Sequence, residues 1–232
     1  MNHSMVSLPC NASVEVPSRL ATARQVLSSL AVLIRDPNRL DQVLVFVTAV
    51  NARTMGHKVG PLLASPAWQT LFAERPLIDE EHVDFGALSR LPDGTLGREY
   101  VRFLRDNGIS PEPFLVGPDA GEARVNYLIL RYRQTHDIWH VVTGYKPDVD
   151  GELMLQAFTY AQTEATSSLL LVALGLLRYR LHWRSLKRAL AAYRLGKRLR
   201  EFGPTRWEQM FSWPLERVRE AVGASADDIP TT

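Results

Sequence analysis

The chain has 232 residues, of which 46% are hydrophobic and 22% charged, and its formal net charge at pH 7 is +2. This length suits one domain of somewhat above typical size, and the composition excludes a disordered or fibrous protein. The single cysteine, Cys10, excludes an intramolecular disulfide and indicates a reducing compartment.

Residues 1–17 are expected to form a flexible N-terminal segment. They lack the basic flank and long apolar run of a signal peptide and the arginine-rich pattern of a transit peptide. The longest apolar run, Leu169 to Leu177, has nine residues, well below the roughly 18 that a membrane-spanning helix needs. These features predict a bacterial-type cytoplasmic protein without a membrane span.

Helical periodicity dominates residues 18–222. The first predicted helix carries apolar residues at spacings of three and four, which would form its buried face: Leu20, Ala23, Leu27, Leu30 and Ile34. Asp36 and Pro37 are typical of the N-cap and first position of a second helix, which Gly56 would end. The two helices are expected to form an antiparallel pair.

Three shorter helices are predicted next: one from Ser65-Pro66 to before Pro76, one within 79–90, and one from Thr95 to a left-handed cap at Asn107-Gly108. Asp119, with Glu122 three residues later, resembles a capping box before a long helix that ends near Gly144.

Asp150 is expected to cap a further helix that continues through Leu177. A basic helix at 178–200 and a loose tail at 223–232 complete the chain. Because no run is typical of strands, we predict an all-α, single-domain helical bundle over residues 18–222.

A candidate metal site lies on the predicted helix at 120–143. Its core-facing stripe has spacings of four, three, four and four residues, and consists of Val125, Ile129, Tyr132, His136 and His140. The last two positions of the stripe are thus histidines. Imidazoles at positions i and i+4 point the same way and can share a divalent ion. Asp137 can bind at the edge of such a site or orient a ligand. The alternative is a pair of histidines satisfied within the core.

Glu152 would join this group from the first turn of the returning helix, because an antiparallel hairpin brings it to His140. Two histidines with one or two carboxylates suit Zn²⁺, with Mn²⁺, Co²⁺ or Mg²⁺ as alternatives, and three ligands would leave an open position. Glu152 can equally just complement the helix dipole. Asp rather than Glu follows His136, which disfavours a zinc protease.

The stretch "RYRQTHDIWHVVTG…GE" resembles the zinc-site signature of the coenzyme Q biosynthesis protein 4 family, His-Asp-x-x-His, eleven residues, then Glu. The matching residues are His136, Asp137, His140 and Glu152. The resemblance extends to "DPNRLDQV", "LPDGTLGREY" and "RWEQMFSWPLERVREAVG". It implies an all-helical protein, a homodimer attached to a membrane surface at the inner face of the cell membrane, which binds a metal and prenyl lipids. It also implies a part in organising other quinone-biosynthesis enzymes, or in oxidative decarboxylation at ring carbon C1.

The basic helix at 178–200 has nine Lys and Arg residues, no acid, and an apolar stripe: Tyr179, Trp183, Leu186, Leu190 and Tyr193. This pattern suits an anionic membrane surface, although the same stripe can pack on the core while the arginines are solvated. Nucleic acid is not expected as a partner, because no nucleic-acid-binding fold is recognisable.

An isoprenoid pocket could be lined by the apolar segments 169–177 and 43–50, and ordinary core packing explains them equally well. Arg98 and Tyr100 could face a headgroup or quinone ring, or fix helix contacts.

Three functions remain open on the sequence. The first is a metal-dependent decarboxylase, a lyase acting on a polyprenyl hydroxybenzoate. The second is a non-catalytic scaffold that presents isoprenoid lipids to partner enzymes. The third is a metal-dependent phosphohydrolase, which would need further ligands such as His57 and His82.

Overall fold

The structure, a computed structural model, describes residues 19–35, 40–111, 123–178 and 183–230. Within these residues the protein is all-α, as predicted, and β-pairing is limited to an isolated bridge between Thr95 and Pro214. None of the helices described combines the length and apolar character needed to span a bilayer. The helices in chain order are α1 (Arg19–Arg35), α2 (Leu40–Thr54), α3 (Gly56–Leu62), α4 (Pro66–Glu74), α5 (Phe85–Ser89), α6 (Leu96–Asp106), α7 (Ala123–Thr143), α8 (Val149–Thr163), α9 (Thr166–Arg178), α10 (Trp183–Arg198), the 3-10 turn η1 (Trp207–Gln209), α11 (Leu215–Ala221) and the 3-10 turn η2 (Ala226–Asp228).

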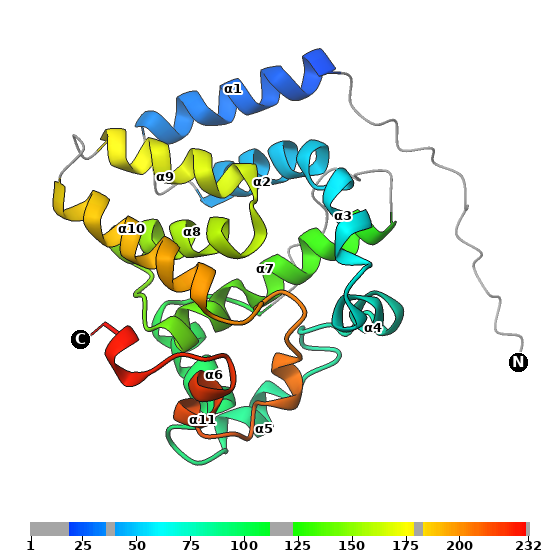
Figure 1. Cartoon of the computed structure of the whole chain (residues 1–232), viewed down its shortest axis with the longest axis vertical. Helices are drawn as coiled ribbons and strands as arrows, with labels where there is room; N and C mark the ends of the chain where they lie inside the picture. Colours follow the sequence, from blue (N-terminus) through cyan, green and yellow to red (C-terminus); the bar gives the residue numbers. More distant parts are fainter. Residues whose placement is uncertain (1–18, 36–39, 112–122, 179–182, 231–232) are drawn as a thin grey trace, which may run out of the picture.

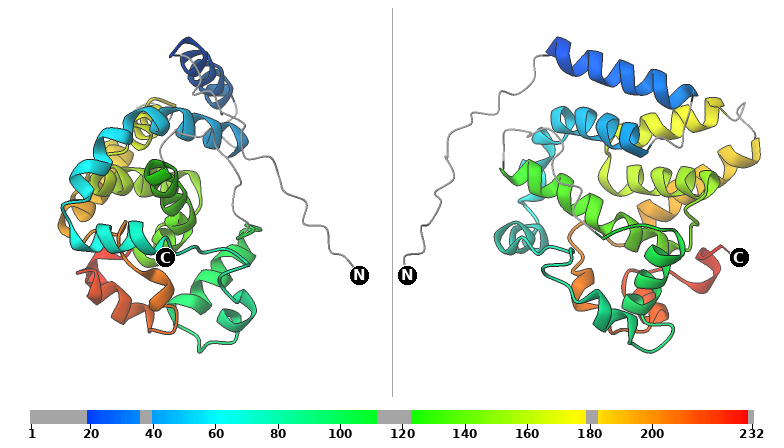
Figure 2. Two further views of the ribbon diagram at one scale, coloured as in Figure 1. Left: turned by 90° about the vertical axis from the view of Figure 1, so that its right-hand side faces the viewer. Right: turned by 180° about the vertical axis from the view of Figure 1, so that it is seen from behind.

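The long helix α7 runs diagonally through the molecule (Figure 1). On one side lie α1, α2, α8 and α9, and on the other lie α5, α6 and α11, an arrangement also visible from behind in Figure 2. Direct contacts join α7 to α2, α3, α6 and α11. A side chain on α7 can therefore meet groups from both halves of the protein.

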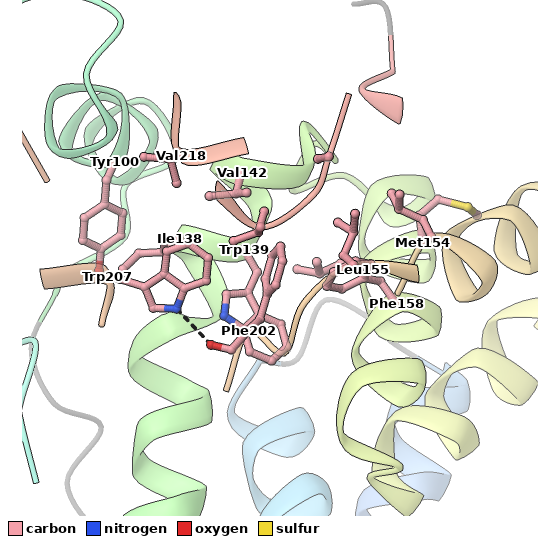
Figure 3. Close-up of a cluster of buried hydrophobic side chains, with 14 of the residues drawn as sticks. Tyr100, Ile138, Trp139, Val142, Met154, Leu155, Phe158, Phe202, Trp207 and Val218 are labelled. Atoms are coloured by element: carbon pink, nitrogen blue, oxygen red, sulfur yellow. Dashed lines mark hydrogen bonds between the residues drawn. The ribbon is translucent and has the colours of Figure 1, made fainter. Parts of the chain in front are cut away.

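Trp139 of α7 lies at the centre of the largest apolar core (Figure 3). Its ring makes edge contacts with Phe158 of α8 and with Phe202, at centroid distances of 6.2 and 5.6 Å. The indole of Trp207 packs on Phe202 and donates a hydrogen bond to its carbonyl oxygen at 3.2 Å. Aromatic rings bury much apolar area at low entropic cost, so this cluster fixes the C-terminal half of α7.

The first two helices form the expected antiparallel pair at one edge of the molecule (Figure 1). The predicted buried face of α1 is only partly correct. Leu30 packs on the cluster around Phe46 of α2, but Leu20 and Leu27 are 78% and 64% exposed. Ser29 and Leu33, which lie outside the predicted face, are buried. Because α1 lies at the edge, only one narrow face meets its neighbours, and Leu33 joins the cluster centred on Phe46 of α2.

The helix α10 packs closely along α8 (Figure 1). Its buried residues are Leu195 and three small ones, Ala189, Ala192 and Gly196. A Cβ on Gly196 would come within 2.7 Å of the Ala161 Cβ, so glycine permits the close approach. The predicted apolar stripe is divided between core and surface. Leu186 packs on the core and Tyr193 stacks on Tyr160, whereas Trp183 and Leu190 are 62% and 43% exposed. Tyr179 lies outside the described residues.

Several predicted helix ends are confirmed. The helix beginning at Pro66 ends before Pro76, and Gly108 and Gly144 adopt left-handed backbone conformations after α6 and α7. The predicted caps at 36–37 and 119–122 and the segment 1–17 lie outside the described residues.

Two boundaries differ from the prediction. The cap of α8 is Asp148, not Asp150, because the Asp148 carboxylate accepts a hydrogen bond from the Gly151 amide at 2.7 Å. The single helix predicted through Leu177 is two helices, since Glu164 takes a left-handed conformation (φ 52°) between α8 and α9.

The segment 223–230, where the sequence predicts a loose tail, contains η2. Ser225 and Asp228 form a reciprocal capping box, and Asp228 also pairs with Arg198 of α10. Ile229 lies against Gly144, where a Cβ on the glycine would come within 2.7 Å of the Ile229 Cγ2 atom. The segment thus packs against the loop that follows α7.

Candidate metal centre

Three of the four predicted ligands lie on the last turns of α7. His140 is buried, while the side chains of His136 and Asp137 are 29% and 24% exposed. One nitrogen or oxygen atom from each of the three residues lies within 4.8 Å of the others. Spacings of three and four residues place them on one side of the helix, so the local helical geometry alone assembles the group.

Glu152 reaches this group from the first turn of α8. Its Oε1 atom lies 3.0 Å from the His140 Nε2 atom, and its Oε2 atom lies 3.8 Å from the His136 Nε2 atom. The hairpin predicted from the loop length therefore brings all four residues together.

The loop between α7 and α8 depends on two glycines. Gly144 ends α7 at φ 74°, and a Cβ on Gly151 would lie 1.9 Å from the carbonyl oxygen of Lys146. No side chain fits at that distance. Glycine at position 151 therefore lets the loop fold back tightly enough to place Glu152 beside the histidines.

The ring of His140 is held in one orientation. Its Nδ1 atom lies 2.9 Å from the backbone carbonyl of Tyr145, which can only accept a hydrogen bond. This contact leaves Nε2 facing Glu152, where the nitrogen donates a hydrogen bond when it is protonated and can offer its lone pair to a metal when it is not. Phe103 of α6 stacks on the ring at a centroid distance of 5.3 Å. Neither Tyr145 nor Phe103 was predicted, because backbone carbonyls and long-range ring contacts leave no local pattern.

The charges of the site act on one another. Burial opposes protonation of His136, but its hydrogen bond to Asp137 and the charges of Glu152 and Asp137 outweigh burial and raise the pKa of His136. Burial alone would raise the pKa of Glu152, but the hydrogen bond from His140 and the two imidazoles hold that pKa below its usual value. The site thus favours an ionised carboxylate facing two nitrogen ligands.

The other candidate residues are not members of the metal group. Tyr100 is buried and stacked on Phe211, and burial together with the charge of Asp137 raises its pKa far above the usual value. Arg98 donates a hydrogen bond to the carbonyl of Ser89, so it fixes a helix contact. His57 is exposed on α3 and His82 bonds Asp79 at 2.6 Å, and neither belongs to the metal group. The further ligands that a phosphohydrolase would need are not supplied by these two histidines.

The segments predicted to line an isoprenoid pocket lie against each other. Leu171 of α9 packs on the cluster of Phe46 and Val50 from α2. Leu169 and Leu170 are 44% and 39% exposed. A cavity of about 260 Å³ lies against the loop after α7, lined in part by Tyr145, Asp150 and Arg188.

Fold and site together define an all-helical protein with a histidine and carboxylate group where two helices meet. The family model described as coenzyme Q (ubiquinone) biosynthesis protein Coq4 matches residues 13–227. The chain belongs to this family, and the resemblance inferred from the motif is confirmed.

Relatives and a solved structure agree with this membership. The chain is 33% identical over 214 residues to the mitochondrial ubiquinone biosynthesis protein COQ4 homolog of Danio rerio, covering 89% of this chain and 79% of the relative. The Homo sapiens homolog is 31% identical over 207 residues, covering 85% and 76%. A crystal structure of a putative ubiquinone biosynthesis protein from Nostoc punctiforme has a TM-score of 0.70 at 28% identity, covering 87% of this chain and 96% of that one.

Proposed function

We propose that this ubiquinone biosynthesis protein holds a divalent metal with His136, His140 and Glu152, with Asp137 as a further ligand or as the orienter of His136. The observation that carries the proposal is the meeting of His140 Nε2 and Glu152 Oε1 at 3.0 Å, beside a second histidine and a second carboxylate. Two imidazoles with carboxylates are a donor set for Zn²⁺, with Mn²⁺, Co²⁺ or Mg²⁺ as alternatives.

The ligand is a polyprenylated benzoate or quinone intermediate, and the reaction is oxidative loss of the C1 carboxylate. In this reaction a ring carbon exchanges its bond to the carboxylate for a bond to oxygen, carbon dioxide leaves, and an oxidant such as dioxygen accepts two electrons. A bound metal supplies a Lewis acid that polarises an oxygen of the aromatic acid. The Tyr145 carbonyl keeps the His140 Nδ1 proton in place, which fixes the direction in which Nε2 points.

Metal analysis tests the site. We expect metal to copurify with the wild type and to be lost in His140→Ala, because the buried imidazole is the best-oriented ligand. His57→Ala, which removes an exposed histidine on α3, is the matched control and should retain the metal. Equal metal content in all three proteins would end the proposal.

Turnover separates an enzyme from a scaffold. The purified protein, loaded with metal, is given a prenylated hydroxybenzoate and dioxygen, and carbon dioxide is measured. An enzyme releases it and His136→Ala does not. If the wild type binds the ligand without turnover, the protein instead presents prenylated intermediates to other quinone-biosynthesis enzymes.

The outer face of α10 is our candidate for contact with an anionic membrane surface. Trp183 and Leu190 are exposed there, and Lys187 lies over the Trp183 ring at 5.1 Å. Exposed aromatic and basic groups on one helix suit the headgroup region. Binding to vesicles of anionic lipid should weaken with added salt and with Arg184→Glu. Salt-insensitive binding would contradict an electrostatic contact.

The protein is expected to act as a homodimer with no nucleic acid partner. Light scattering of the purified protein measures the mass, and a monomer mass at micromolar concentration would contradict the first expectation.

A further inference from the structure

Arg133 lies on the same side of α7 as the proposed metal ligands. It precedes His136 by three residues and His140 by seven, so at about 100° per residue all of these side chains fall within roughly 60° of it. Arg133 is half-buried. Arg133 therefore shares the face of α7 that carries the histidines, about two turns before His140.

The guanidinium of Arg133 lacks partners in the described part of the chain. Its Nε and Nη2 atoms are both buried without a hydrogen bond, and no carboxylate of the described residues forms an ion pair with it. Burial lowers the pKa of Arg133, and no acidic group opposes the effect. Arg131 also has two buried nitrogens without partners, Nε and Nη1, but its charge is compensated, because its Nη2 atom binds Glu208 at 2.9 Å.

The two unpaired nitrogens of Arg133 form one edge of the guanidinium. Nε–H and Nη2–H point in parallel along this edge, which matches two oxygens of a carboxylate or phosphate. A buried positive charge without a counterion is costly, and an anion that supplies two hydrogen bonds removes the cost. The chemistry of this edge thus specifies an oxyanion.

A neighbouring side chain on α7 also has unused polar atoms. Gln134, the next residue after Arg133, has both amide atoms buried without partners. Its amide nitrogen is a hydrogen-bond donor. A second unpaired donor therefore stands directly after Arg133 on α7.

We propose that Arg133 binds the anionic group of the ligand through its Nε and Nη2 atoms, with the Gln134 amide supplying an additional hydrogen bond. This inference rests on the proposed function, because the ligand is the one held at the metal group. Arg133 is then the residue that distinguishes an anionic prenylated compound from its neutral counterpart.

Calorimetric titration with paired ligands tests the proposal. One pair is a prenylated hydroxybenzoate and the matching phenol without the carboxylate, and the other is a prenyl monophosphate and the free prenol. Wild type should bind at least one anion roughly 10- to 100-fold more tightly than its neutral partner, as expected for a charge-assisted bidentate contact. The pair that shows this preference identifies the oxyanion as carboxylate or phosphate.

Arg133→Met should reduce the preference to about twofold or less while leaving the affinity for the neutral ligand unchanged, because only the fork is lost. Arg133→Lys keeps a charge without the fork and should fall between the two. Arg124→Met, which changes an exposed arginine of the same helix, is the matched control and should behave as wild type. An undiminished preference in Arg133→Met would overturn the proposal, as would an equal loss of affinity for the neutral ligands.

Two measurements separate this proposal from metal binding. The titrations are repeated after chelator treatment, and the metal content of Arg133→Met is compared with wild type. The wild-type protein could hold no metal and still prefer the anion, with that preference lost in Arg133→Met. In that case the metal proposal fails and this one stands. The thermal midpoint of ligand-free Arg133→Met should be no lower than that of wild type, because a buried unpaired charge is removed. A lower midpoint would indicate a purely structural arginine.

Discussion

Removing one partner of the buried ion pair between Arg131 and Glu208 should strongly destabilise the protein. Arg131 is fully buried on the side of α7 away from the metal group, and its Nη2 atom binds a Glu208 oxygen at 2.9 Å and the Thr205 carbonyl at 2.7 Å. Glu208→Gln removes the negative charge and leaves the guanidinium in the core with only neutral acceptors.

The magnitude follows from the burial of the pair. Removing one partner of a buried pair costs about 3–5 kcal/mol, and because the Glu208 side chain retains 16% exposure we expect the lower end, about 3 kcal/mol. For a domain of this size, a loss of about 3 kcal/mol lowers the thermal midpoint by roughly 6–12 °C. Urea unfolding followed by circular dichroism gives the free energy of unfolding, and a thermal scan gives the midpoint.

Glu74→Gln is the matched control. Glu74 binds Arg206, which also binds Glu208, but the Glu74 side chain is 52% exposed, so its loss should cost less than about 1 kcal/mol. A Glu208→Gln effect as small as that of Glu74→Gln would refute the reasoning. The combined change Arg131→Met with Glu208→Leu should recover most of the lost stability, since no unpaired charge remains.

The effect of Glu208→Gln should also depend on pH. Burial alone would raise the pKa of Glu208, but the charge of Arg131 and the hydrogen bonds from Arg206 and Arg131 hold it below the usual value of 4.5. A lowered folded-state pKa contributes stability above pH 4.5 that is lost as the pH falls through the folded-state value. The difference between wild type and Glu208→Gln should therefore shrink on acidification, and a constant difference would contradict this assignment.

Three further changes probe the site and its surroundings. Gly151→Ala should lower both the thermal midpoint and the metal content, because the backbone leaves no room for a Cβ, whereas Gly60→Ala, with open space around it, should not. Asp148→Ala should cost about 1 kcal/mol in the free energy of unfolding, as expected for a lost N-cap. His82 should titrate above pH 6.5 by NMR because its hydrogen bond to Asp79 raises its pKa, and Asp79→Asn should lower that pKa.

A different result would contradict each of these three predictions. Equal metal content in Gly151→Ala and Gly60→Ala would show that the loop does not position Glu152. A change in Asp148→Ala of less than a few tenths of a kcal/mol would show that the cap is not used. A raised folded-state pKa for His82 implies stability that is present below pH 6.5 and lost as the pH rises, so a stability that instead increases through that range would contradict the contact.

The helix ends that the sequence predicts correctly are those with a local cause. Pro66 begins α4, and Gly108 and Gly144 adopt the left-handed conformation that glycine allows. The break at Glu164 has a different origin, because no glycine or proline stands there. The Lys58 ammonium of α3 hydrogen-bonds to the carbonyl of Thr163 at 3.3 Å and also to that of Glu164. A residue more than a hundred positions away thus satisfies the helix end, and local patterns carry no trace of it.

The apolar stripes of α1 and α10 are each only partly buried. Periodicity identifies a stripe of apolar residues, but the neighbouring helix decides how much of that stripe is covered. On α10 the close approach of α8 brings Gly196 inward beside the buried Leu195, while Trp183 remains 62% exposed. The apolar pattern alone therefore does not identify the packing face.

The candidate metal group could be predicted because its determinants are local, whereas Arg133 could not. His136, Asp137 and His140 share one helix, and a short hairpin brings Glu152 to them, so spacing alone sufficed. In the sequence Arg133 looks like any polar residue beside a helix stripe. Its distinguishing property is a buried guanidinium edge with no carboxylate paired to it among the described residues, and only the arrangement of every neighbouring element reveals that. An uncompensated buried charge lowers the stability of the fold. An anionic ligand that pairs with the Arg133 guanidinium would supply the missing counter-charge.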